Sequence, residues 1–212
     1  MARESTTPTR QRAKSASTKI VAGRTLVTGF GPFGTVTSNP SGFLAEQCGR
    51  EHRLLEVSYR AVREFLTRLD PESFDRLLLL GVAAGAKKCR VELFARNLIG
   101  PTPDVHGEVP GPREIVPNAP RVLGGTLWDG TRLLSPKLIA DHARLVHSFS
   151  AGAYLCNYVY FEALLRFREK RVGFLHVPLE DDMPLEEQLE AVKEVIDEIE
   201  RPPVGKENIA NG

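Results

Sequence analysis

The chain has 212 residues, of which 42% are hydrophobic and 26% charged, a size and composition typical of one compact globular domain. Its apolar runs are far shorter than the roughly 18 residues that a membrane-spanning helix needs, which excludes a membrane-spanning protein. The formal net charge is only +1, so no overall electrostatic field favours binding to nucleic acid or to acidic lipid, and neither is an expected partner.

Both ends of the chain have the composition of disordered segments. Residues 1–19 contain five basic residues, one acidic residue and no large apolar side chain after Met1, and residues 201–212 begin with Arg-Pro-Pro and are almost devoid of apolar side chains. Such segments cannot bury enough surface to offset the entropy that they lose on ordering. We therefore predict a disordered basic tail over residues 1–19, a single domain over residues 20–200 and a flexible tail over residues 201–212.

Between these tails, apolar runs with strand character alternate with helical periods. Helices are predicted to begin at Asn39-Pro40 and at Ser135-Pro136, where a capping residue precedes a proline suited to the first helical position, and after Pro184. Strands are predicted over residues 25–30, 54–59, 77–82, 145–149 and 172–177 and in a segment near 91–98. This alternation predicts a three-layer α/β/α sandwich with a mainly parallel, twisted central sheet, whose active site lies at the carboxyl ends of the strands.

A glycine-rich turn follows the first predicted strand. Residues 29–34, Gly-Phe-Gly-Pro-Phe-Gly, match the G-x-G-x-x-G pattern of dinucleotide-binding folds, but that fingerprint leads directly into a helix, whereas the next helix here starts only at Asn39-Pro40. The turn fits better a pocket in which Phe30 and Phe33 hold a small flat apolar ligand between their rings. Packing of both rings beneath the loop is the structural alternative.

The three cysteines, Cys48, Cys89 and Cys156, are too few for a disulfide framework and lack the CxxC spacing of a zinc site, which indicates free thiols in a reducing compartment. Cys156 differs from the others because a turn of small residues, 150–153, leads from a predicted strand into the helix that it begins, running to about residue 168. The positive end of a helix dipole favours thiolate, and the unpaired N–H groups there can bind an oxyanion. Cys156 is therefore a candidate nucleophile, with a buried structural cysteine as the alternative.

A thiol nucleophile needs a base to carry its proton and a third group to orient that base. His176 is the best-placed histidine, because it lies near the end of the predicted strand 172–177, from which a side chain reaches the catalytic edge of the sheet. Glu92 is an acid within an otherwise apolar strand, and an inward-facing carboxylate needs a partner such as histidine. A surface-facing glutamate is the alternative for Glu92.

Five collinear segments together resemble the cysteine-dependent, type I pyroglutamyl peptidases. The matches run from about residue 25 to residue 199 and leave only the tails outside. They comprise residues 27–34 with 39–41, residues 81–97, residues 103–110 with a P-D-x-x-G-x-x-P pattern, residues 151–157 and residues 174–178.

The resemblance implies a role for each candidate residue. Cys156 would be the nucleophile, His176 the general base and acid, and Glu92 the group that orients His176. Phe30 and Phe33 would flank the pyrrolidone ring of an N-terminal pyroglutamate. Two further residues, Asn39 and Val82, would contribute to the same substrate pocket.

The resemblance also implies an activity and a setting. It predicts an α/β/α sandwich that removes pyroglutamate from peptide N-termini through a thioester acyl-enzyme, in the cytosol, without a metal or cofactor. Its expected partners are peptides with N-terminal pyroglutamate, and association into a homo-oligomer, as in bacterial members, is compatible with it.

The segment 81–97 departs from the bacterial pattern at two positions. Many bacterial members carry Gln and Arg directly after two of its glycines, where this chain has Val82 and Ala86. Lys87 or Lys88 is a candidate replacement for the missing charge. Two alternatives therefore stay open: a hydrolase with the same three residues and another small acyl or lactam substrate, and a non-catalytic α/β protein that binds a small ligand or nucleotide in the phenylalanine pocket.

Overall fold

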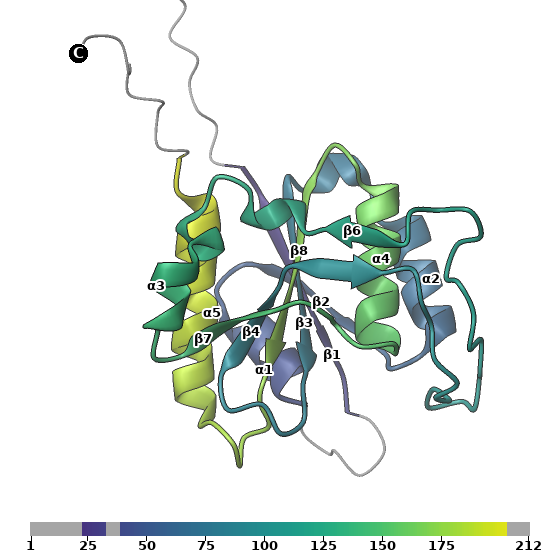
Figure 1. Ribbon diagram of the computed structural model, residues 1–212, viewed down its shortest axis with the longest axis horizontal. Coiled ribbons are helices and arrows are strands. Elements are labelled where there is room, and N and C mark those ends of the chain that lie inside the picture. Colours follow the sequence, from purple (N-terminus) through teal and green to yellow (C-terminus); the bar gives the residue numbers. More distant parts are fainter. Residues whose placement is uncertain (1–22, 33–38, 203–212) are drawn as a thin grey trace, which may run out of the picture.

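The computed structural model describes residues 23–32 and 39–202. Six strands form one mixed sheet in the order β2-β1-β3-β8-β4-β7, and a separate antiparallel pair, β5-β6, lies beside it (Figure 1). β2, β1, β3 and β8 run parallel, β4 is antiparallel to β8, and β7 is parallel to β4. The strands are β1 (Thr25–Phe30), β2 (Glu51–Leu55), β3 (Arg76–Val82), β4 (Cys89–Glu92), β5 (Phe94–Arg96), β6 (Val122–Gly124), β7 (Leu145–Ser148) and β8 (Arg171–Val177).

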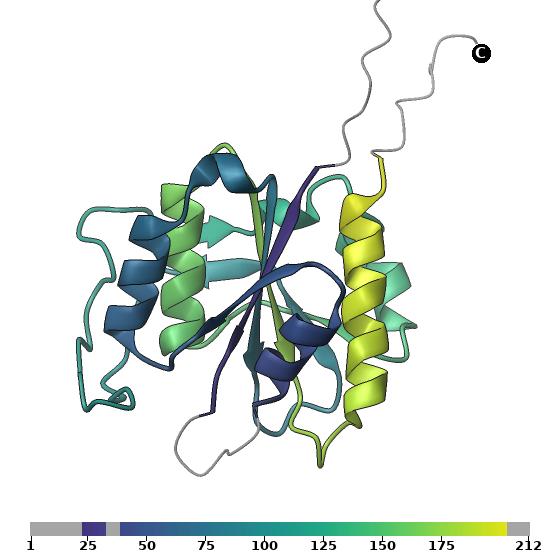
Figure 2. The ribbon, with the colours of Figure 1, turned by 180° about the vertical axis from the view of Figure 1, so that it is seen from behind.

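Helices cover both faces of this sheet, so the predicted α/β/α sandwich with a mainly parallel sheet is confirmed (Figures 1 and 2). One face carries α1 (Pro40–Gln47), α3 (Pro136–Ala140) and α5 (Leu185–Glu200), and the other carries α2 (Tyr59–Arg68) and α4 (Leu155–Arg166). Short 3-10 turns complete the secondary structure at η1 (Pro71–Ser73), η2 (Thr126–Trp128) and η3 (Arg132–Leu134). No helix in the described ranges is long and apolar enough to cross a bilayer.

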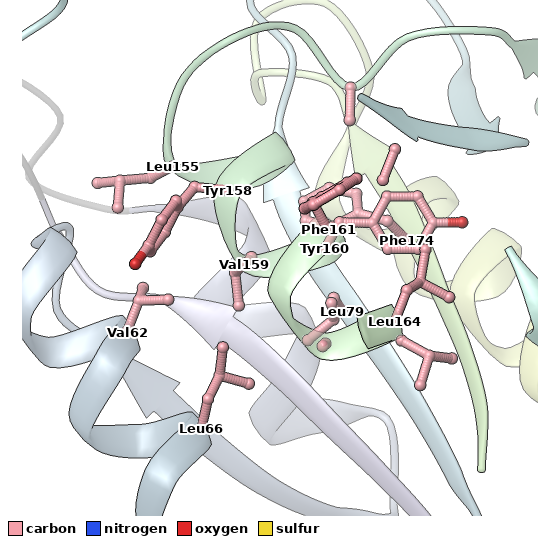
Figure 3. Packing of buried hydrophobic residues seen from close by; sticks show 14 of the residues in the cluster. Val62, Leu66, Leu79, Leu155, Tyr158, Val159, Tyr160, Phe161, Leu164 and Phe174 are labelled. Atoms are coloured by element: carbon pink, nitrogen blue, oxygen red, sulfur yellow. The ribbon is translucent and has the colours of Figure 1, made fainter. Parts of the chain in front are cut away.

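The central strand β3 explains why the core is divided into two layers. Its leucines alternate: Leu77 and Leu79 pack in the layer of α2 and α4, whereas Leu78 and Leu80 pack in the layer of α1 and α5. A strand that is covered on both faces needs apolar residues at every position, because successive side chains point to opposite sides of the sheet. Figure 3 shows the first of these layers, with Leu79 of β3 among side chains of α2 and α4.

Two predicted strands were wrong in extent. The predicted strand 54–59 is the end of β2 followed by the start of α2, because Ser58 is a helix N-cap whose side chain accepts a hydrogen bond from the N–H of Ala61. The predicted segment 91–98 breaks at Leu93 into β4 and β5. At this break the Glu92 carbonyl accepts hydrogen bonds from the side chains of Trp128 and Tyr160, which lie outside the sheet.

The other predicted elements agree with the structure within a few residues. α1 and α3 begin at the prolines that follow the predicted capping residues, and each capping side chain accepts a hydrogen bond from its own helix. The helix predicted after Pro184 is α5, which buries its apolar stripe against the sheet. The predicted tails lie, apart from Arg201 and Pro202, outside the described residues.

Candidate active site

The antiparallel pairing of β4 with β8 brings Glu92 to His176. Glu92 lies opposite Phe174, two residues before His176, so the acid and the histidine are diagonal neighbours on one face of the sheet. A hydrogen bond of 2.7 Å joins Nδ1 of His176 to Oε1 of Glu92, and both side chains are buried. Because Nδ1 is engaged by the carboxylate, Nε2 is the ring nitrogen that remains for a third group.

That third group is the thiol of Cys156. Cys156 is the second residue of α4 and is half-buried, and it is close enough to His176 to raise the pKa of the imidazole. Gly81 pairs with His176 across β3 and β8, and a Cβ added to Gly81 would lie 2.8 Å from Sγ of Cys156 and 2.7 Å from Cζ of Phe174. The absence of a side chain at Gly81 therefore makes room for the thiol beside the imidazole.

Two opposing effects act on the protonation of His176. Burial by itself lowers the pKa of His176, but the neighbouring Cys156 and the hydrogen-bonded Glu92 offset it and raise the pKa to about 9. The carboxylate and a thiolate both stabilise the positively charged imidazolium. At neutral pH the arrangement therefore favours a protonated His176 beside the sulfur of Cys156.

A small pocket of about 80 Å³ opens beside Cys156. The Asn39 side chain at its edge has a structural role in this state: Nδ2 donates to the Gly31 carbonyl at 2.9 Å, and Oδ1 accepts from N–H and Oγ–H of Ser41 at 3.1 Å and 2.8 Å. Asn39 thus caps α1 and ties it to the end of β1. The pocket is lined mainly by apolar side chains, and its residues are Phe30, Asn39, Val57, Val82, Tyr154, Leu155 and Cys156.

The structure brings most of the predicted site residues to one place. Glu92 is hydrogen-bonded to His176, and Cys156 influences the pKa of the same imidazole. Three of the four predicted pocket residues, Phe30, Asn39 and Val82, line the pocket. The fourth, Phe33, lies outside the described residues.

Sequence reasoning missed Val57, Tyr154 and Leu155 as pocket residues. Tyr154 and Leu155 directly precede Cys156, so their closeness in the chain was a usable signal. Val57 offered no such signal, because residues 54–59 were predicted as a strand, whereas Val57 lies between β2 and α2. Within residues 23–32 and 39–202 there is no group of three or more His, Cys, Asp or Glu side chains suited to holding a metal ion.

Neither candidate for the missing bacterial arginine lines this pocket. Lys87 forms an ion pair with Asp182 on the loop that follows β8, and Nζ of Lys88 donates to the His142 carbonyl at 2.7 Å. Ala86 is buried. Among the described residues the wall of the pocket around Val82 is therefore apolar.

Comparisons with known proteins agree with this site. A family model described as pyroglutamyl peptidase matches residues 23–199. The chain is 33% identical over 176 residues to a pyrrolidone-carboxylate peptidase of Thermococcus onnurineus, covering 77% of this chain and 87% of that protein.

Solved structures give the same result. The pyrrolidone carboxyl peptidase of Thermococcus litoralis aligns with a TM-score of 0.73 and 28% identity over 86% of this chain and 98% of its own. A pyrrolidone carboxyl peptidase of Thermus thermophilus aligns with a TM-score of 0.69 and 34% identity over 82% of this chain and 99% of its own. Since the family match spans nearly all of the described fold and includes Cys156, His176 and Glu92, the chain belongs to the pyroglutamyl peptidase family of cysteine hydrolases.

Proposed function

We propose that Cys156, His176 and Glu92 carry out the reaction of this enzyme, the removal of N-terminal pyroglutamate from peptides. The observation that carries the proposal is the buried 2.7 Å hydrogen bond between Glu92 and His176, with Cys156 near His176 and lining a small pocket. These are the nucleophile, base and orienting group that covalent acyl transfer requires.

The lining of the pocket favours recognition of a small uncharged acyl group of the substrate. Phe30 and Val82 offer apolar walls, and Asn39 shapes the rim through its bonds to the backbone. An ordinary peptide N-terminus carries a charged amine, whose transfer from water into such a pocket is costly. Pyroglutamate has no such amine, because its nitrogen is part of the lactam ring.

The reaction begins when the thiolate of Cys156 attacks the carbonyl carbon that follows the ring. The unpaired N–H groups in the first turn of α4 are positioned to stabilise the oxyanion that forms. The His176 imidazolium then gives its proton to the departing amine as the C–N bond breaks, which leaves a thioester on Cys156 and a neutral imidazole.

Water completes the reaction. His176 accepts a proton from water while the water oxygen attacks the thioester carbonyl, and the C–S bond breaks to release free pyroglutamate and restore the thiolate beside the imidazolium. Glu92 keeps Nδ1 of His176 engaged throughout, so that Nε2 faces the reacting atoms. This chemistry requires a reduced thiol, which fits an expected location in the cytoplasm, and all three cysteines are free.

The test is hydrolysis of a fluorogenic pyroglutamyl amide by the purified full-length protein under reducing conditions. We expect release of the fluorophore from this substrate, none from a prolyl amide, and none from either substrate with Cys156→Ala. A folded wild-type protein that releases no fluorophore would overturn the proposed reaction and favour another small acyl or lactam substrate, a choice that the apolar Val82 would then explain. Activity retained by Cys156→Ala would overturn the assignment of the nucleophile.

A further inference from the structure

Asn157, the residue after Cys156, uses its side chain to hold a segment distant in the sequence. The side chain is fully buried. Its Oδ1 accepts from the Arg96 N–H, and its Nδ2 donates to the carbonyls of Arg96 and Leu98, all three at 2.8 Å. Both amide protons and the carbonyl oxygen of Asn157 are thus engaged by one stretch of backbone.

This arrangement differs from the usual role of asparagine at the start of a helix. There its side chain caps the N–H groups of its own helix, whereas the side chain of Asn157 turns away from α4 to β5 and the residues that follow it. Asn157 therefore links two chain segments: α4, which carries the thiol, and β5, which begins two residues after Glu92.

A second residue of α4 holds the other end of the same stretch. The hydroxyl of Tyr160 donates to the Glu92 carbonyl at 3.0 Å, and Nε1 of Trp128 donates to the same carbonyl at 2.9 Å. Tyr160 lies one turn beyond Asn157, so the two side chains share a face of α4. Figure 3 shows the ring of Tyr160 beside Phe174, the β8 residue paired with Glu92.

A third contact lies on the turn before the helix. The N–H of Gly100 donates to the Ala153 carbonyl at 2.6 Å. The chain from Glu92 to Gly100 is therefore bonded to the turn and first two turns of α4 at successive points. Neither segment can slide along the other without breaking several of these bonds. Each buried donor or acceptor left unpaired would destabilise the folded state.

We propose that Asn157 is a positioning residue that sets the distance between the Cys156 thiol and the Glu92–His176 pair. The inference rests on the proposed function, since it concerns the same nucleophile and base. Asn157 touches neither the substrate pocket nor the reacting groups among the described contacts, and acts through the backbone of β5 and α4. Its loss is expected to affect the chemical step more than the binding of the ring.

The first variant is Asn157→Ala, which removes all three hydrogen bonds. Because a displacement of about 1 Å between reacting groups costs on the order of 10²-fold in rate, we expect kcat to fall about 10- to 100-fold while KM changes less than about threefold. The rate of alkylation of Cys156 by iodoacetamide should also fall near neutral pH, with its pH profile moved to higher pH, because a displaced imidazolium supports the thiolate less well.

The matched control is Asn97→Ala. Asn97 is also a buried amide held by three backbone contacts, accepting from the Val116 N–H and donating to the carbonyls of Val116 and Ala119. Its partners belong to the loop before β6 and not to α4. We expect Asn97→Ala to lower the melting temperature in the same way and to leave kcat and the pH profile of alkylation close to those of the wild type.

The proposal would be overturned if Asn157→Ala lowered the melting temperature but left kcat and the alkylation profile as in the wild type. If Asn157→Ala does not fold, Asn157→Asp provides the test. Its carboxylate keeps an acceptor for the Arg96 N–H but cannot donate to the two carbonyls. A kcat and an alkylation rate equal to those of the wild type in this variant would overturn the proposal. Alkylation needs no substrate, so these measurements remain decisive even if the wild type fails to hydrolyse a pyroglutamyl amide.

Discussion

At the scale of single residues, the proposed mechanism gives the Glu92 carboxylate an influence on the reaction through its hydrogen bond to His176. We predict that Glu92→Gln moves the alkaline fall of kcat/KM to lower pH. The neighbours of His176, Cys156 and Glu92, hold its pKa at about 9, and an uncharged amide no longer stabilises the imidazolium that must protonate the leaving amine. The measurement is kcat/KM against pH; an alkaline limb that does not move would show that Glu92 does not govern this protonation.

The same residue makes a prediction about stability. A raised pKa in the folded state contributes stability that is fully present below the ordinary histidine value of 6.5 and is lost as the pH rises through about 9. The free energy of unfolding of the wild type should therefore carry a component that decreases across this interval, and Glu92→Gln should flatten it. Urea unfolding at several pH values measures both, with His176→Ala as a control in which this component is absent.

The positions of these residues in the fold could be predicted from the sequence better than their surroundings. Cys156 and His176 lie at the start of a helix and near the end of a strand, positions that local patterns reveal. The partners of Asn157 are 61 and 59 residues away in the chain, at Arg96 and Leu98, and depend on the break of the strand at Leu93. No periodicity encodes that break, because side chains of other elements, Trp128 and Tyr160, stabilise it.

At the scale of elements, there is a division between α4, which bears on the proposed activity, and α5, which bears on stability alone. α4 carries the proposed nucleophile on one face of the sheet, whereas α5 packs on the other face, away from the pocket. The pair Val159 and Val195 tests this division, since both valines are fully buried, one in each helix.

We predict that Val159→Ala and Val195→Ala each lower the free energy of unfolding by about 2 kcal/mol, as removal of two buried methyl groups should. Only Val159→Ala should also lower kcat, because it weakens the packing of α4 against the sheet one turn from the thiol. Urea unfolding and steady-state kinetics at a temperature where both variants are folded provide the measurement. A fall in kcat for Val195→Ala equal to that for Val159→Ala would contradict the division.

The elements that the sequence predicted well are those with local causes. The starts of α1 and α3 follow from a capping side chain next to a proline, and the stripe of α5 follows from its period. The strand expected at residues 54–59 was wrong because its apolar residues also suit the entry to a helix, and the cap at Ser58 decides between the two.

At the scale of the whole molecule, the fold buries the three cysteine thiols to different extents. Cys48 and Cys89 are buried in the layer of α1 and α5, whereas Cys156 is half-buried at the pocket. Burial raises the pKa of Cys48, and it raises the pKa of Cys89 to about 12, so neither forms thiolate near neutral pH. Only Cys156 combines access to solvent with a neighbouring imidazolium.

We therefore predict that iodoacetamide at pH 7 modifies Cys156 first in the native protein and that Cys48 and Cys89 react only at the rate at which the core opens. In denaturant all three should react at similar rates, because the differences arise from the fold and not from the local sequence. Mass spectrometry of peptides taken at successive times follows each thiol separately, and His176→Ala should slow Cys156 alone. Native Cys89 reacting as fast as Cys156 would mean that the sheet at β4 opens readily, which would leave Glu92 and His176 without the fixed geometry that the chemistry requires.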